Sequence, residues 1–123
     1  MNFRTVASWA SGVCILFGLA FLLAPLPTLA VYGYQGSDPI VAIMTRFFGS
    51  AFLMFGLFAW GARGIENTEI QRAASRLSVI AFLIGAGVSL LAVFSGTFNA
   101  LTWSSVAIYL IFAALWARVG YMS

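Results

Sequence analysis

The chain contains no histidine, no lysine and a single cysteine, and only 7% of its 123 residues are charged. Without histidine it has no axial haem ligand of the usual type and no histidine metal site. One cysteine, Cys14, provides no disulfide framework and cannot by itself hold an iron–sulfur cluster. We therefore expect no covalently bound or metal-ligated cofactor, although the chain could contact bound lipids or the pigments of a partner complex.

The apolar runs of the chain also lack aspartate and glutamate. Proton-coupled pumps and transporters usually keep an acid or a histidine at membrane depth. Catalysis needs a nucleophile with a base in reach, and no base accompanies the serines and threonines here. A nucleic-acid-binding protein would need a clustered basic face with base-contacting groups, and the sequence shows none. The sequence therefore predicts neither an enzyme nor a nucleic-acid partner.

Hydrophobic residues, by contrast, make up 63% of the chain and fall into four long runs. A soluble domain carries about 25% charged residues, so lipid is the expected solvent. Crossing about 30 Å of hydrocarbon takes about 20 apolar residues in a helix. The runs predict an all-α fold, an integral membrane antiparallel four-helix bundle that forms one domain over residues 1–123. Its helices are expected at about 5–24, 40–62, 70–94 and 100–118.

Turn chemistry separates these helices. "PLP" (25–27) and "YGYQGSDP" (32–39) end the first run, "GIENTE" (64–69) forms the middle turn, and "SGTFN" (95–99) forms the last. Thr68 followed by Gln71 matches a capping box and predicts where the third helix starts.

The arginines are distributed unequally between the two ends of the predicted bundle. Four crossings place both termini on one side, together with five of the six arginines, whereas Arg46 is nearest the other side. By the positive-inside rule both termini should be cytoplasmic, in the inner membrane of a bacterium. Arg63, Arg72 and Arg76 form a basic cluster that we expect to anchor against anionic lipid. Contact with an acidic partner surface is the alternative.

Small residues predict where the helices approach one another. Lipid tails are as apolar as leucine, so small residues that admit a neighbouring backbone drive helix association. Gly49 and Gly56 lie seven residues apart, and Ala81, Gly85 and Ser89 follow at four-residue spacing. We expect these faces to pack inside the bundle, with an interface to a partner subunit as the alternative.

Arg46 lies inside an apolar run, about 10 Å along its helix from the outer end. Three roles are open to it. It can reach the headgroups by snorkelling. It can bind Asp38 or free carbonyls of the outer loop, or it can receive a lipid phosphate, an anionic ligand or a partner carboxylate.

The segments "RFFGSAFLMFGL" (46–57) and "SGTFNALTWSSVAIYLIFAALWA" (95–117) resemble small bacterial four-helix membrane proteins of unknown function, including DoxX-like proteins. The resemblance implies a four-helix inner-membrane protein and supplies no catalytic residue.

Two functions follow as expectations. The first is a non-catalytic accessory or assembly subunit of a larger bacterial membrane complex of the respiratory or photosynthetic type, in contact with lipids and other integral membrane subunits. The second is a small membrane protein that binds or transports a lipid or small molecule by means of Arg46 near the outer leaflet.

Overall fold

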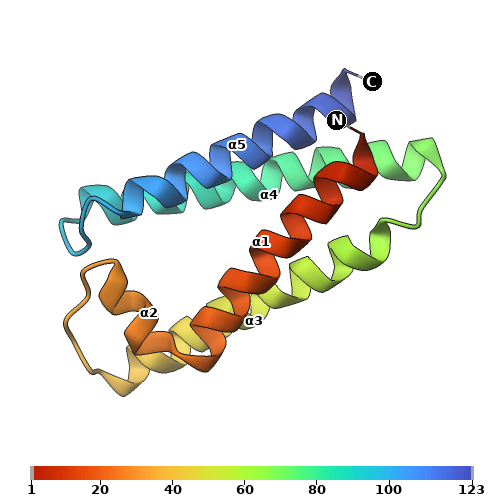
Figure 1. The fold of residues 1–123 in the computed structure, drawn as a ribbon. Helices are drawn as coiled ribbons and strands as arrows, with labels where there is room; N and C mark the ends of the chain where they lie inside the picture. The colour runs from red at the N-terminus through yellow and green to blue at the C-terminus, as the bar shows by residue number, and fades with distance from the viewer. Residues whose placement is uncertain (1, 123) are drawn as a thin grey trace.

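The computed structural model describes residues 2–122, and every regular element in that range is a helix. The elements are α1 (Phe3–Leu23), α2 (Pro25–Val31), α3 (Pro39–Ala62), α4 (Thr68–Phe94) and α5 (Thr102–Tyr121). All except α2 are long and apolar enough to cross a membrane. The predicted all-α membrane bundle is confirmed, and the chain is a multi-pass membrane protein (Figure 1).

The short helix α2 was not predicted, because the two prolines indicated a plain turn. The chain does break at Ala24, but Pro25 then occupies the first turn of a new helix. Proline is tolerated there because the first helical N–H groups have no intrahelical acceptor. The Thr28 hydroxyl donates to the Ala20 carbonyl at 3.0 Å and ties α2 to the end of α1.

The N-cap of α4 was predicted one residue too late, at Thr68, and the helix begins at Thr68 rather than at about residue 70. Asn67, not Thr68, is the N-cap, and its side-chain oxygen accepts from the N–H groups of Glu69 and Ile70 at 2.9 and 3.2 Å. Gln71 does not return to the cap but donates to the Ile65 carbonyl at 2.6 Å. Asn67 is the N-cap because its side-chain oxygen satisfies two of the free N–H groups of the first turn.

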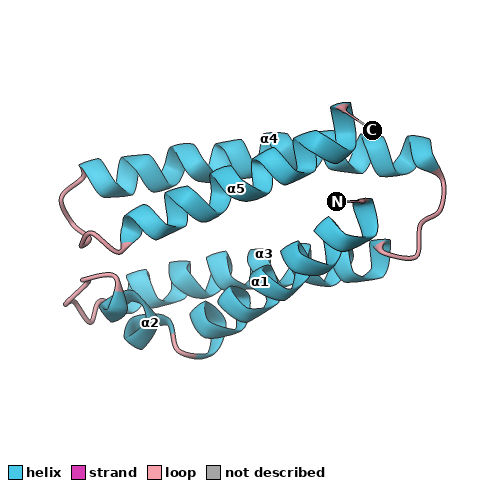
Figure 2. Ribbon diagram, turned by 45° about the horizontal axis from the view of Figure 1, so that its top comes forward, coloured by secondary structure: helices cyan, strands magenta, loops and turns pink. Residues whose placement is uncertain are grey.

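The helices form two layers, with α1 packed along α3 and α4 packed along α5 (Figure 2). Glycines bring the first two backbones together: a Cβ added at Gly49 would lie 2.7 Å from the Leu22 nitrogen, and one at Gly18 the same distance from the Leu53 nitrogen. In the second layer, Gly120 fits against Arg76 and Ser75. Close approach within each layer is what small residues provide in lipid.

The layers meet at both ends of the bundle. We call the end with the two termini the terminal end and the opposite one the far end (Figure 1). At the terminal end, the rings of Phe3 and Trp116 pack edge to face, with centroids 5.8 Å apart. At the far end, Asn99 donates from its backbone N–H to the Tyr32 carbonyl at 2.8 Å and from its side-chain amide to the Val31 carbonyl at 3.1 Å. Between these two ends lies the cavity described next, which aromatic contacts between the layers border.

Candidate functional site

Three adjoining apolar hollows lie between the two layers, and we call them the compartments of one cavity because they share lining residues. The inner one has a volume of about 180 Å³, the middle one about 320 Å³ and the outer one, nearest the far end, about 390 Å³. Neighbouring compartments share lining residues: Phe52 and Phe82 line the inner and middle ones, and Phe21 and Phe48 the middle and outer ones. Sites for small molecules typically measure about 300–1,000 Å³, so the larger two compartments fall in that range.

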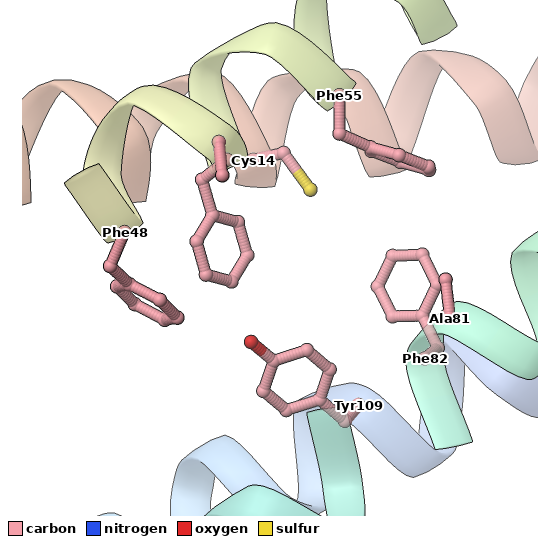
Figure 3. Close-up of a pocket in the computed structure, with 8 residues that line it drawn as sticks. Cys14, Phe48, Phe55, Ala81, Phe82 and Tyr109 are labelled. Carbon is pink, nitrogen blue, oxygen red and sulfur yellow. The ribbon is translucent and has the colours of Figure 1, made fainter. Parts of the chain in front are cut away.

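Aromatic rings set the inner limit of the cavity. Phe55 meets Phe82 across the layers with ring centroids 5.5 Å apart, and Phe52 meets Tyr109 at 6.1 Å. Farther out, the ring contacts of Phe48 within residues 2–122 are all in its own layer, with Phe52 at 4.7 Å and Phe21 at 5.2 Å. Ring contacts therefore join the two layers at this level, and the inner compartment lies among Phe55, Phe82 and Tyr109 (Figure 3).

Gly85 shapes the wall of the middle compartment. A Cβ at this position would collide with the ring of Tyr109. The glycine therefore lets the Tyr109 ring lie against α4, and the phenol oxygen points into the space between the layers (Figure 3).

The outer compartment opens sideways between α3 and α4. Ile40 and Met44 of α3 line it, and their side chains are 66% and 57% exposed. Val88 of α4 lines it too and is 58% exposed. Residues that line a cavity and face outward form its rim. In a membrane this rim faces the lipid tails.

Five residues that line the cavity carry a hydroxyl group that makes no hydrogen bond within residues 2–122. They are Tyr32, Ser89, Thr102, Ser105 and Tyr109. The oxygen of Thr102 is fully buried, in a residue only 6% exposed. Elsewhere in the helices hydroxyls usually return to their own backbone, as when Ser75 donates to the Gln71 carbonyl at 2.7 Å. Most buried polar side chains have a partner, so the buried hydroxyl of Thr102 is unusual.

The cavity carries no formal charge. Among the described residues, no aspartate, glutamate or arginine lines any of its three compartments. An ionised ligand would be buried there without a counter-charge, which is strongly unfavourable. The lining therefore suits an uncharged molecule.

Arg46 lies outside this cavity. It is exposed on α3 and borders a shallow hollow together with Leu22, Ile43, Phe47 and Ser50. Asp38 is the N-cap of α3, and its carboxylate accepts from the Ile40 N–H at 2.9 Å. Within residues 2–122 no ion pair joins the two side chains.

Two arginines of the basic cluster bind backbone at the terminal end. Arg63 donates to the Trp60 carbonyl at 3.2 Å, and its guanidinium lies 3.4 Å from the centre of the Trp60 ring. Arg76 donates to the Gly120 carbonyl at 2.9 Å and so ties α4 to the end of α5. Arg72 lies one turn before Arg76 on α4.

The residues expected to pack helices divide into two groups. Gly49 and Gly56 lie at the contact of α3 with α1, where a Cβ at Gly56 would come within 2.7 Å of Ile15. Gly85 accommodates an aromatic ring, while Ala81 and Ser89 line the cavity. The small-residue face of α4 is therefore largely a cavity wall.

Comparison with protein-family models, curated proteins and solved structures finds no match to this chain. The resemblance to DoxX-like proteins stays a prediction.

Proposed function

We propose that this protein binds an apolar molecule of the membrane in the cavity between its two helix layers. The observation that carries the proposal is the lateral opening of the outer compartment between α3 and α4, at Ile40, Met44 and Val88. A ligand can pass from the lipid phase into the cavity there without crossing water. Arg46 has no part in this site, so the proposal keeps the predicted binding function but moves it to other residues.

The size and lining of the cavity support this proposal. An apolar pocket with a few convergent polar groups is the usual form of a small-molecule site. On α3 the lining extends from Ile40 to Phe55, fifteen positions apart, which corresponds to about 22 Å at about 1.5 Å per residue. One leaflet contributes about half of the roughly 30 Å hydrocarbon thickness. The cavity is thus long enough for a single lipid chain.

Photolabelling tests the proposal directly. A lipid with a diazirine in its chain should label residues that line the cavity, and peptide mapping after illumination identifies them. Ala92 lines the outer compartment, so Ala92→Phe should block labelling by filling it. Ala107 is exposed on α5, and Ala107→Phe is the matched control that should label normally. Equal labelling of both variants would contradict the proposal.

The accessory-subunit function is a second candidate, favoured by a different observation. A Cβ added at Gly12 or Gly87 would meet nothing within 4 Å, so both glycines face outward. Such notches in a lipid-facing surface suit the close approach of another helix. Mild extraction from native membranes should then yield a complex that Gly12→Leu disrupts. Recovery of the chain alone would count against this role.

The bacterial inner membrane, with both termini in the cytoplasm, is the proposed location. The arginines at the terminal end support it through the positive-inside rule. Single cysteines introduced at Asn2 and Ser37, in a Cys14→Ser background, should react with a membrane-impermeant thiol reagent from opposite sides of the membrane. The same sidedness for both would refute the topology.

A further inference from the structure

We infer that the ligand is a neutral single-chain lipid with an uncharged oxygen-bearing head, such as an alcohol, held by hydroxyls at the outer compartment. The inference rests on the proposed function and adds to it the chemistry and the orientation of the ligand.

The hydroxyls without partners are concentrated at one end of the cavity. Four of the five line the outer compartment, those of Tyr32, Ser89, Thr102 and Ser105. The fifth, on Tyr109, lies seven residues beyond Thr102 on α5, which is about 10 Å deeper along the helix. A ligand with its polar group among the four and its chain beside Tyr109 matches this distribution.

Thr102 provides the strongest individual evidence. Its hydroxyl is buried and has no partner, although the residue stands at the first position of α5. Such a group costs free energy unless something bonds to it. A ligand oxygen would satisfy it once a rotation about the Thr102 Cα–Cβ bond turns the hydroxyl toward the outer compartment, since a hydroxyl both donates and accepts.

A second threonine in the same compartment shows the contrast. Thr45 also lines the outer compartment, but its hydroxyl donates to the Val41 carbonyl at 2.7 Å and is already satisfied. Two threonines therefore line one compartment, and of the two only the Thr102 hydroxyl has its donor hydrogen unused.

The orientation follows from the position of the hydroxyls. The outer compartment adjoins the far end, where α3 and α5 begin. A head bound there stays near the membrane boundary, and the chain extends toward the aromatic rings of Phe52 and Phe82. The ligand thus keeps the orientation of an ordinary lipid and needs no inversion to enter through the rim between α3 and α4.

The head is uncharged because no arginine, aspartate or glutamate among the described residues lines the cavity. The hydroxyls could help to solvate an anion but cannot neutralise it, so an anionic head prefers the membrane surface.

Three photoactivatable probes with the same chain test the inference. They are hexadecanol, hexadecane and hexadecanoate, each with a diazirine at mid-chain, presented to the purified protein in phosphatidylcholine nanodiscs. Labelling is quantified by intact-protein mass spectrometry against probe concentration. We expect hexadecanol to bind about tenfold more tightly than hexadecane, the effect of about one ligand hydrogen bond. Hexadecanoate should label least.

Two matched variants assign the preference to the hydroxyl of Thr102. Thr102→Val should bring hexadecanol and hexadecane close to equal labelling, whereas Thr45→Val should leave the preference for hexadecanol intact. Both variants keep the volume and branching of the side chain. Loss of the preference in both, or in neither, would overturn the assignment to Thr102.

The remaining outcomes separate this inference from the proposed function. Equal labelling by hexadecanol and hexadecane, still blocked by Ala92→Phe, would overturn the head chemistry and leave the cavity site standing. Preferred labelling by hexadecanoate would overturn the claim of an uncharged head. Labelling of cavity residues by none of the probes would overturn both.

Discussion

Thr102→Val should stabilise the ligand-free protein, whereas Thr45→Val should destabilise it. The Thr102 oxygen is buried without a partner in a residue 6% exposed. Removing an unsatisfied buried hydroxyl recovers about 1–3 kcal/mol in soluble proteins. In a membrane this gain in stability is smaller, because polar groups of the unfolded chain also find hydrogen-bond partners there. We therefore expect an increase of about 1 kcal/mol in the free energy of unfolding.

The Thr45 substitution removes a real hydrogen bond, 2.7 Å long, to the Val41 carbonyl. Hydrogen bonds in membrane proteins contribute about 0.6 kcal/mol on average. The two variants should consequently differ by about 1.5 kcal/mol, which is slightly more than tenfold in the unfolding equilibrium.

The assay is a titration of the delipidated protein in mixed micelles with increasing dodecyl sulfate, followed by circular dichroism. Delipidation matters, because a bound ligand would hydrogen-bond the Thr102 hydroxyl. Thr102→Val would then lower the free energy of unfolding instead of raising it. If Thr102→Val proves less stable than the unsubstituted protein after complete delipidation, the hydroxyl has a partner in the folded chain. The Thr102 hydroxyl would then have no free hydrogen bond for a ligand.

Three further predictions concern the scaffold of the cavity. Gly49→Leu should lower the free energy of unfolding by about 2–3 kcal/mol, because the side chain would collide with the α1 backbone. The control is Gly12→Leu, whose side chain would enter open space and should leave the free energy of unfolding nearly unchanged. Asn99→Leu removes the side-chain hydrogen bond to Val31 and should weaken the neighbouring backbone bond to Tyr32 at the far end. Amide hydrogen exchange in residues 31–34 should therefore increase. Unchanged exchange would show that the Asn99 side chain does not hold the layers together. Arg76→Gln should lower stability by about 1 kcal/mol in the same titration, because the charged hydrogen bond to Gly120 is lost and the site is partly exposed.

Much of the fold was predictable from the sequence, because lipid narrows the choice of structure to helices. The four long runs of apolar residues appear as α1, α3, α4 and α5, with ends within a few residues of the expected ones. The short α2 was missed because two prolines in three residues indicate a turn, although proline also suits a first helical turn.

The cavity was not predictable in the same way. Glycines and alanines at helical spacing look alike whether they admit a helix, an aromatic ring or a ligand. Gly49 admits a helix, Gly85 admits the Tyr109 ring, and Ser89 lines the cavity. One signal was present in the sequence: Thr102, Ser105 and Tyr109 follow at three- and four-residue steps and so share one face of a helix. The sequence does not indicate the distance between the two helix layers.

Arg46 stands out in the sequence because a charge within an apolar run is unusual. The structure places it on the outer surface of α3, away from the cavity. Snorkelling to headgroups and contact with a ligand or partner stay as predictions for it.

The most direct test of the cavity's function is native mass spectrometry of the protein released from its own membranes in a mild detergent. The unsubstituted protein and the Ala107→Phe control should each retain one small neutral lipid, and Ala92→Phe should appear without it. If all three proteins release no ligand, or all three carry the same molecule, the cavity between the helix layers is not a binding site.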